Sequence, residues 1–301
     1  MNFKIIFAVF IVLVSTGCIC SSVPFDETEA FDMLKCQSQW LHRYPGGKDS
    51  EKCRSYLKEK LEPYCQIYTE QNFIHETKDK KISLKNIIGI INPKAKEYII
   101  LGSHYDNRPV SDEEWDADLA KKPCPGANDG ASSTATLLET AKVLHSKKPP
   151  YGIVIVLFDG EDYGKSEKDM YLGSKYFAEH IDDIVPKGKI KAGIILDMVG
   201  DTNLNIYIER TSKLAAPELV DSIWKSAEKL GYRSIFIPKA KYAISDDHDS
   251  LLEHGIPCID IIDFDYRFWH TTKDTADKCS PKSLKIVGNT IIDFIYTKGS
   301  D

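Results

Sequence analysis

Five polar groups recur along the chain, and their side chains are of the kinds that hold a metal ion and move protons. In chain order they are His104-Tyr-Asp106, Gly126-Ala-Asn-Asp129-Gly, Gly160-Glu161-Asp162, Asp197 and Trp269-His270. Together they offer imidazole nitrogens and carboxylate oxygens, a combination that suits zinc far better than nucleophilic catalysis. The sequence therefore predicts a zinc-dependent site.

Other common catalytic chemistries lack their motifs in this chain. There is no Gly-x-Ser-x-Gly nucleophile elbow, no phosphate-binding Gly-x-x-x-x-Gly-Lys loop and no Gly-x-Gly-x-x-Gly fingerprint. The His-Glu-x-x-His pair of many zinc peptidases is absent from the sequence as well. No cysteine is accompanied by the residues that a cysteine nucleophile needs nearby.

The residues that could do chemistry follow apolar runs that have the length of buried strands. His104 comes after Glu97–Gly102, Glu161 after Gly152–Phe158, and Asp197 after Lys191–Leu196. These runs are apolar on both faces, as the strands of a helix-covered parallel sheet must be. Ligands bind beyond the carboxyl ends of such strands, so the three residues are expected at one edge of the sheet.

Helical periodicity alternates with these strands, which predicts an α/β fold. Helices are expected at Phe25–Arg43, Ser50–Leu61, Ala131–Ser146, Tyr171–Glu179, Pro217–Leu230 and Pro281–Tyr296, and further strands at Cys65–Thr69, Lys85–Ile91 and Ile256–Ile262. We therefore expect a three-layer sandwich in which helices cover both faces of a mixed, largely parallel central sheet. No linker divides the 301 residues, so a single catalytic domain is predicted over residues 21–301.

Two of the acidic positions allow more than one interpretation. Glu161 and Asp162 are adjacent at a strand end and point in different directions, so one can bind a metal ion while the other faces the substrate as a base. A solvated acidic turn is the alternative.

Asp129 stands just before the helix that begins at Ala131, where an aspartate is a good cap. The small residues beside Asp129 would also let a metal ion approach, so both roles stay open.

The roles of the histidines also stay open when each residue is considered alone. His270 follows an irregular segment and Trp269, which favours a ligand over a structural histidine. His104 is either a metal ligand or a histidine that hydrogen-bonds beside the site, with Asp106 placed to orient it. The cluster Asp246-Asp-His248 precedes a short helix and could be a cap with solvated charge.

The first twenty residues differ from the rest of the chain. Lys4 is followed by the uninterrupted apolar run Ile5–Val14 and then by small residues, which is typical of a secretory signal peptide and too short to span a bilayer. Gly17-Cys18 also resembles a bacterial lipobox, with Ser15 in place of the usual aliphatic residue. We expect a secreted protein or, if the source is bacterial, a periplasmic or cell-envelope lipoprotein anchored at Cys18.

Composition narrows the range of partners. The net charge is −6 and there is no basic run, which argues against nucleic acid. No later segment is apolar enough for a transmembrane span, and nothing indicates an obligate interface, so a monomer is expected. The eight cysteines fit an oxidising compartment, in which Cys36 and Cys53 could form a disulfide bond across the turn at Tyr44-Pro-Gly-Gly.

Taken together, the motifs resemble the M28 metallopeptidase-like superfamily and, within it, the glutaminyl-peptide cyclotransferases (glutaminyl cyclases) of animals and bacteria. The resemblance rests on His104-Tyr-Asp-Asn-Arg-Pro, Pro125-Gly-Ala-Asn-Asp-Gly-Ala-Ser, Leu157-Phe-Asp-Gly-Glu-Asp-Tyr-Gly, Ser245-Asp-Asp-His248, Gly255-Ile-Pro-Cys-Ile-Asp-Ile-Ile262 and Trp269-His-Thr271. It covers nearly all of the chain after the first twenty residues. The fold that it implies is that of the zinc exopeptidases.

The resemblance also implies roles for single residues. One zinc ion per chain would be held by Asp129, Asp162 and His270. The catalytic residues would be Glu161 as general acid and base, Asp197 as a second carboxylate and Asp246 in a proton-handling network, while Trp269 and His104 would lie against the substrate. Two positions depart from the animal enzymes, which have glutamate at the position of Asp162 and histidine at that of Asp260.

The reaction that the resemblance implies is cyclisation of an N-terminal glutamine of peptides or proteins to pyroglutamate, with release of ammonia. A di-zinc aminopeptidase of the same superfamily is the alternative, in which Asp129 bridges two ions and His104 and Asp197 bind the second. Trp269, the Asp-Asp-His cluster and the Asn-Arg-Pro loop favour the cyclase. A binding protein without activity is disfavoured by the intact Glu161.

Overall fold

A six-stranded sheet forms the centre of the protein in the computed structural model, which describes residues 23–298. Its strands lie in the order β1-β2-β4-β3-β5-β8. Their bounds are Ile67–Glu76 (β1), Lys81–Ile91 (β2), Tyr98–His104 (β3), Gly152–Phe158 (β4), Ile190–Asp197 (β5) and Cys258–Ile262 (β8). The four strands from β4 to β8 are parallel, whereas β1 and β2 are antiparallel to their neighbours. The sheet is therefore mixed and largely parallel, as the sequence predicts.

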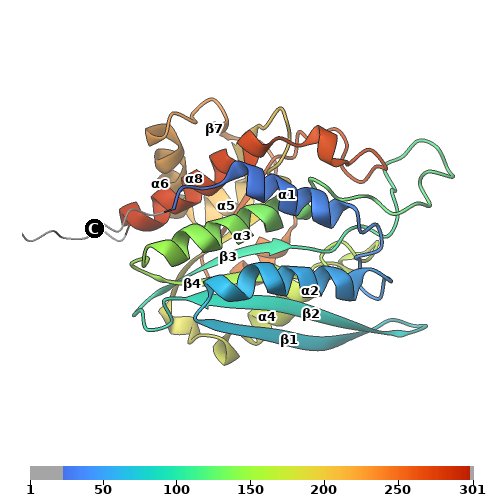
Figure 1. Cartoon of the computed structure of the whole chain (residues 1–301), viewed down its shortest axis with the longest axis horizontal. Coiled ribbons are helices and arrows are strands. Elements are labelled where there is room, and N and C mark those ends of the chain that lie inside the picture. The colour runs from blue at the N-terminus through green and yellow to red at the C-terminus, as the bar shows by residue number, and fades with distance from the viewer. Residues whose placement is uncertain (1–22, 299–301) are drawn as a thin grey trace, which may run out of the picture.

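Helices cover both faces of this sheet (Figure 1). They are α1 (Glu27–Ser38), α2 (Ser50–Leu61), α3 (Ala131–Ser146), α4 (Leu172–Glu179), α5 (Arg210–Ala215), α6 (Pro217–Lys229), α7 (Asp247–Glu253) and α8 (Pro281–Lys298). Short 3-10 turns lie at Glu62–Tyr64, Glu167–Asp169, Ile181–Asp183, Lys187–Lys189 and Ala276–Lys278. The structure thus confirms the predicted three-layer sandwich.

Alternation along β4 shows why the sandwich has two separate cores. Ile153, Ile155 and Leu157 pack with residues of α1, α2, α3, α6 and α8. Val154 and Phe158 point to the opposite face, where they pack with residues of α4 and α7. Successive side chains of a strand point to opposite faces, so a strand buried on both faces must be apolar throughout.

The structure extends or corrects several predicted elements. The strands expected at 65–69 and 85–91 are parts of one long hairpin, whose outer half alternates exposed and covered residues and so lacks a continuous apolar run. The first helix ends at Ser38 instead of Arg43. A two-stranded parallel sheet of β6 (Ile206–Ile208) and β7 (Phe236–Ala240) was not expected, because strands of three and five residues give almost no periodic signal.

The predicted signal peptide and the predicted disulfide bond have different outcomes. The predicted signal peptide and the lipobox at Cys18 lie outside the described residues. Between residues 23 and 298, no helix is long and apolar enough to cross a membrane. The six cysteines of this region are free thiols, Cys36 and Cys53 included, so the expected disulfide bond is not formed here.

The buried Asp263, just after β8, gives a test of the fold by its dependence on pH. Its carboxylate accepts the backbone N–H groups of Asn205 at 2.8 Å and Asp265 at 3.1 Å, yet burial raises its pKa to about 7. Between roughly pH 4 and 7 the folded state therefore keeps a proton on Asp263 that the unfolded state has released. Proton binding to the folded state stabilises it, and this stabilisation is lost as the pH rises. The wild type should therefore lose free energy of unfolding relative to Asp263→Asn between pH 4.5 and 7.5.

Urea unfolding at the two pH values measures this difference. Asp116→Asn is a suitable control, because the backbone N–H groups of Leu119 and Asp118 lower the pKa of the exposed Asp116, so its contribution should stay constant over the same window. A wild type that becomes more stable relative to Asp263→Asn as the pH rises would contradict the assignment.

Candidate active site

The predicted site residues meet at the edge of the sheet where the parallel strands end. His104 is the last residue of β3 and Asp197 the last of β5, while Glu161 follows β4 after the turn at Gly160. A pocket at this edge is lined by Asp129, Glu161, Asp162, Met170, Tyr171, Asp197, Met198, Ile244, Ser245, Asp246, Ile262, Phe264, Trp269 and His270. Seven of the eight predicted site residues line this pocket, and the eighth, His104, lies within 4 Å of three of them.

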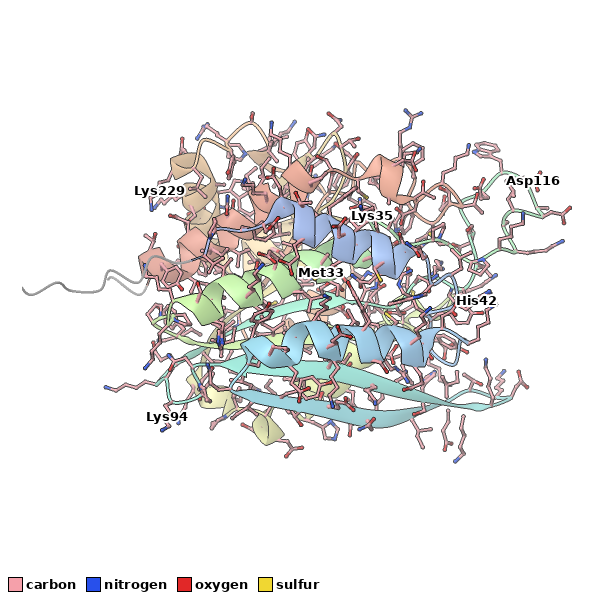
Figure 2. The ribbon with its side chains drawn as sticks, in the orientation of Figure 1. Met33, Lys35, His42, Lys94, Asp116 and Lys229 are labelled. Atoms are coloured by element: carbon pink, nitrogen blue, oxygen red, sulfur yellow. The ribbon has the colours of Figure 1, made fainter. Side chains whose placement is uncertain are left out.

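The chain runs far outward at the same end of the molecule. Figure 2 shows Asp116 at the tip of a projecting loop and His42 at the same end of the molecule, with Lys94 and Lys229 at the opposite end. The loop returns to the site, because the backbone N–H of Glu113 donates to the carbonyl oxygen of His270 at 3.2 Å. The base of the loop is therefore attached to a residue of the site.

Asp129, Asp162 and His270 form a group that could hold a metal ion. His270 Nε2 lies 3.2 Å from Asp162 Oδ1 and 3.5 Å from Asp129 Oδ2, and all three side chains are buried. Asp162 Oδ2 is buried without a hydrogen-bond partner, which is costly unless something else binds it. One nitrogen and two carboxylates are donors that zinc accepts, so the residues present fit this ion.

Arg108 and Asp112 hold two members of this group in place. Arg108 Nη1 donates to Asp162 Oδ1 at 2.9 Å, and its other nitrogens pair with the Asp112 carboxylate at 2.7 Å. Asp112 also lies 3.3 Å from His270 Nδ1, so the ring's other nitrogen, Nε2, faces the group. Although burial would raise it, the pKa of Asp162 stays below its usual range because of His270 and Arg108. The carboxylate is thus ionised, as a metal ligand must be.

Arg108→Ala should weaken zinc binding about 10- to 100-fold, because partners of metal ligands set the orientation of those ligands. Competition with a chromophoric chelator measures the dissociation constant. Arg233→Ala serves as the control, since that arginine pairs with Glu228 on the surface. Unchanged zinc affinity in Arg108→Ala would show that Asp162 needs no such support.

A buried arginine holds the loop that carries Asp129. Arg43 is fully buried and donates to the carbonyl oxygens of Tyr105 at 2.9 Å, Pro125 at 2.7 Å and Gly126 at 2.6 Å. At the end of the loop Gly130 has φ +80°, and a Cβ there would lie 2.8 Å from the His104 ring. The loop therefore needs glycine where it passes His104.

The structure tests the helix-cap interpretation of Asp129. The cap residue of α3 is Gly130, and no side chain caps that helix. The Asp129 carboxylate instead points toward the two histidines, with Oδ1 3.1 Å from His104 and Oδ2 3.5 Å from His270. Asp274 accepts the backbone N–H groups of Asn128 and Asp129 and fixes this direction. The helix-cap role is therefore wrong.

Glu161 is placed differently from its neighbour Asp162. Asp106 accepts the backbone N–H groups of both residues, at 3.2 and 3.3 Å, and so holds the turn. The Glu161 carboxylate faces the pocket, 3.8 Å from His104 Nδ1. Burial, followed by repulsion from Asp162, raises the pKa of Glu161 well above its ordinary value. A carboxyl group that gains a proton this readily is suited to general acid–base catalysis.

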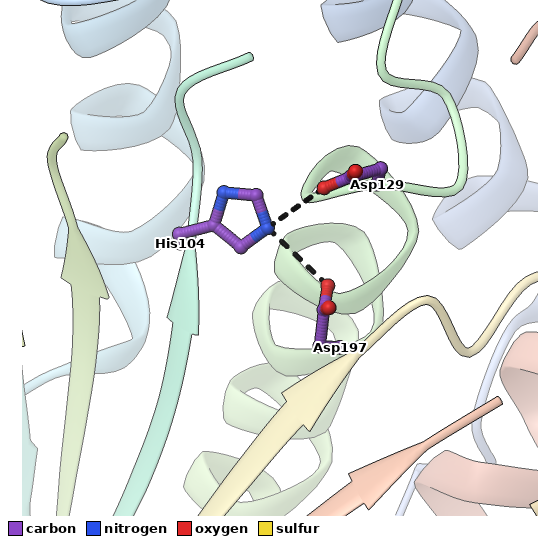
Figure 3. A group of neighbouring side chains, drawn as sticks. All are labelled: His104, Asp129 and Asp197. Atoms are coloured by element: carbon purple, nitrogen blue, oxygen red, sulfur yellow. Dashed lines mark hydrogen bonds and ion pairs between the residues drawn. The ribbon is translucent and has the colours of Figure 1, made fainter. Parts of the chain in front are cut away.

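His104 connects the first group to Asp197 (Figure 3). Its Nε2 lies 3.1 Å from Asp129 Oδ1 and 3.2 Å from Asp197 Oδ1. Burial disfavours the charged ring, but the neighbouring carboxylates of Asp106, Asp129 and Asp197 raise the pKa of His104 well above its usual value. His104, Asp129 and Asp197 also form a second group that could hold a metal ion. The geometry of these three residues is compatible with either interpretation of His104.

The outer wall of the pocket is aromatic. Trp269 stacks on His270 with 3.9 Å between ring centroids and packs against Phe264 at 5.3 Å. Tyr171, Met198 and His270 all have left-handed backbone conformations, with φ between +46° and +57°. Such conformations cost roughly 1–3 kcal/mol each and cluster at functional sites. Asp246 completes the pocket as the cap residue of α7.

Sequence reasoning missed several residues of this site. Arg108, Asp112, Tyr171 and Phe264 were assigned no role, although they fix the metal group or line the pocket. The one available signal was the spacing of Arg108 and Asp112, four residues apart directly after His104-Tyr-Asp. An isolated arginine and aspartate in a loop do not reveal a partner that lies more than fifty residues away.

Comparison with known proteins gives consistent matches. A sequence model of peptidase family M28 matches residues 86–295. The solved glutaminyl cyclase of Bacteroides thetaiotaomicron, bound to N-acetylhistamine, is 34% identical with a TM-score of 0.87, covering 92% of this chain and 99% of that one. The glutaminyl-peptide cyclotransferase of Boiga irregularis is 24% identical over 85% of this chain and 77% of its own. The aminopeptidase YwaD of Bacillus subtilis is 28% identical over 70% of this chain and 44% of its own.

Proposed function

This chain belongs to peptidase family M28, and within that family we propose that it cyclises the N-terminal glutamine of peptides or proteins to pyroglutamate with release of ammonia. The observation that carries the proposal is the similarity to the Bacteroides thetaiotaomicron glutaminyl cyclase, which extends over nearly the whole of both chains. The similarity to the aminopeptidase YwaD spans less than half of that enzyme.

The metal group supports a zinc-dependent reaction. Asp129, Asp162 and His270 would hold a zinc ion, which would supply Lewis acidity toward a carbonyl oxygen. Arg108 and Asp112 keep the ligand atoms turned inward. Trp269 and Phe264 provide an apolar wall for the two methylene groups of a glutamine side chain.

Glu161 performs the proton transfers in this proposal. In the reaction the substrate's own α-amine nitrogen forms a bond with the γ-amide carbon, and the bond from that carbon to the amide nitrogen breaks. Glu161 accepts a proton from the attacking amine and delivers it to the leaving nitrogen, which departs as ammonia. Burial and repulsion from Asp162 raise the pKa of Glu161, which favours its taking up a proton before it delivers one.

Asp197 and Asp246 assist by position. Both line the pocket and are buried, and each can accept a hydrogen bond from the substrate amine or from the departing ammonia. Because the amine and the amide already belong to one residue, the contribution of the pocket is to hold them in a reactive orientation. Water is not a reactant, and the apolar wall helps to keep it out.

The direct test is ammonia release from a dipeptide that begins with glutamine, measured with and without a zinc chelator. We expect ammonia and a pyroglutamyl peptide, and loss of both after chelation. A Gln-dipeptide left intact by the zinc-saturated protein would contradict the proposal. An N-acetylated Gln-dipeptide is a useful control, because it lacks the attacking amine and should remain unchanged.

A di-zinc aminopeptidase is the second candidate function. The specific observation in its favour is the second metal-capable group of His104, Asp129 and Asp197. Release of free amino acids from Leu-initiated peptides, without ammonia from Gln-initiated ones, would favour this function. The two assays on one preparation separate the candidates.

A further inference from the structure

Lysines gather at the edge of the sheet that lies opposite the active site. Three segments meet the sheet there: residues 92–97 between β2 and β3, residues 147–151 between α3 and β4, and residues 182–191, which lead into β5. These segments carry seven lysines and three carboxylates, although the net charge of the whole chain is −6. We call the seven lysines the basic edge; they are Lys94, Lys96, Lys147, Lys148, Lys187, Lys189 and Lys191.

The register of the parallel strands places the three segments side by side. Tyr98, the first residue of β3, pairs with Gly152 of β4 on one side and with Ile190 of β5 on the other. Neighbouring strands lie about 5 Å apart, so the segments that precede these residues emerge next to one another. Figure 2 shows Lys94 at the end of the molecule opposite Asp116. The basic edge is therefore one continuous surface.

Most of the charge of this surface is free to act on a partner. All seven lysines are exposed. Lys191 pairs with Glu97 at 2.9 Å, but the other six form no ion pair with a carboxylate anywhere in residues 23–298. Asp182 is occupied, since it accepts the backbone N–H of Lys187 at 2.7 Å. Clustered charges without counter-charges raise the local potential and attract an anionic partner.

A groove at this edge combines two of the lysines with an apolar surface. Lys94 and Lys148 both line it, and its volume is about 380 Å³. Ile91, Pro93 and Leu144 supply apolar walls, and no carboxylate of the described residues lines it. Ammonium groups beside hydrocarbon suit a ligand that is anionic at one end and apolar at the other. A phospholipid has this character, whereas a nucleic acid backbone offers no hydrocarbon chain.

The described chain also begins at this edge. The backbone N–H of Val23 donates to Ser146 Oγ at 3.0 Å, and Ser146 directly precedes Lys147. Residues 1–22 therefore join the protein beside the basic edge. The predicted lipobox cysteine, Cys18, is five residues before Val23, a distance of at most about 18 Å along the chain. A lipid attached there would bring the basic edge to the membrane, and a lipid and a basic surface reinforce each other in membrane binding.

We propose that the basic edge docks on a membrane surface that contains anionic phospholipids. The lysines bind lipid phosphates, and Lys94 and Lys148 hold one headgroup at the groove. The pocket lies beyond the opposite ends of the parallel strands, so in this orientation it faces away from the lipid and peptide N-termini reach it from solution. Whether the pocket cyclises or hydrolyses its substrate has no bearing on this surface.

Titration of the full-length protein with lipid vesicles tests the docking surface. Sedimentation should give a larger partition coefficient for equal parts of phosphatidylcholine and phosphatidylglycerol than for phosphatidylcholine alone, and the excess should fall as salt is added. Replacing Lys94 and Lys148 together by glutamine should lower partitioning onto the anionic vesicles about 25-fold, or about 5-fold for each lysine removed. Residues 1–22 are the same in every variant, so a lipid attached at Cys18 contributes equally and cancels from these ratios.

The matched control replaces Lys78 and Lys122 by glutamine. Both are exposed and without an ion pair within residues 23–298, and they lie in the β1–β2 turn and after the tip of the projecting loop, away from the basic edge. This variant has the same net charge and should partition like the wild type. Equal partitioning on neutral and anionic vesicles, or an equal loss in both double variants, would overturn the inference. So would duplex DNA binding that depends on Lys94 and Lys148 when vesicle binding does not.

Two measurements separate this inference from the fold and from the proposed function. Circular dichroism confirms that each double variant is folded. Ammonia release from a Gln-dipeptide in the absence of vesicles should be unchanged by either pair of substitutions, because none of the four lysines lines the pocket. Failure of the docking surface and failure of the proposed function therefore give different results.

Discussion

Replacing Glu161 by glutamine should lower kcat for cyclisation by about 10³-fold while the fold and the zinc content stay unchanged. General acid–base catalysis by a positioned side chain contributes about 10²- to 10⁴-fold, and Glu161 is proposed to act in both proton transfers. Glutamine has nearly the same shape but cannot accept the proton. Asp106 holds the backbone of this turn, so its geometry should survive the substitution.

The dependence on pH provides a second readout of the same variant. A general base works only when deprotonated, so kcat/KM should rise with pH as Glu161 loses its proton. Because burial and Asp162 raise the pKa of Glu161, that rise should lie at a higher pH than for an ordinary glutamate. The rise should disappear in Glu161→Gln.

Glu139→Gln is the matched control for this experiment. Glu139 is also buried, but it lies on α3, where it accepts the backbone N–H of Asp26 and is not part of the pocket. It should keep wild-type activity. Near wild-type cyclisation by Glu161→Gln would move the role of base to another carboxylate of the pocket, with Asp197 and Asp246 as the residues to substitute next.

The parallel strands of the sheet were predictable because each is a short apolar run that is followed by a polar residue. Gly152–Phe158 and Ala131–Ser146 have the predicted bounds, since both elements are buried along most of their length. The β1–β2 hairpin and the β6–β7 pair were not predictable to the same extent. Their residues are partly exposed or few in number, and pairing with a distant strand determines where they begin and end.

The site could be predicted as a set of residues but not as a network. The rule that ligands bind beyond strand ends brings His104, Glu161 and Asp197 together without any coordinates. Nothing local shows that Arg43 reaches across 83 residues to bond the loop before Asp129, or that Arg108 reaches Asp162. Asp260 was noticed only as a departure from a family pattern, and its place within 4.8 Å of Asp246 and His248 depends on how α7 packs against β8. Such contacts are fixed by tertiary packing, which a single sequence does not encode position by position.

Asp129→Ala is the second variant with a large expected effect. Asp129 is the one residue shared by both metal-capable groups of the pocket, with one oxygen toward His104 and the other toward His270. Its removal should lower the zinc content by one ion per chain and reduce activity by about 10³-fold or more, because several kcal/mol of Lewis-acid stabilisation are lost. An unchanged zinc content would show that the ligands of the pocket are wrongly assigned.

The effect of Asp129→Ala on thermal stability should depend on whether zinc is present. Burial and the neighbouring Asp162 raise the pKa of Asp129, so without metal this carboxylate is a cost to the folded state. In chelator, Asp129→Ala should therefore unfold at a temperature no lower than the wild type. With zinc present the wild type gains binding energy that the variant lacks, so the order should reverse. Asp118→Ala, on the exposed loop, should follow the wild type under both conditions. If Asp129→Ala were less stable than the wild type even in chelator, Asp129 would be a structural residue rather than a ligand held ready for the ion.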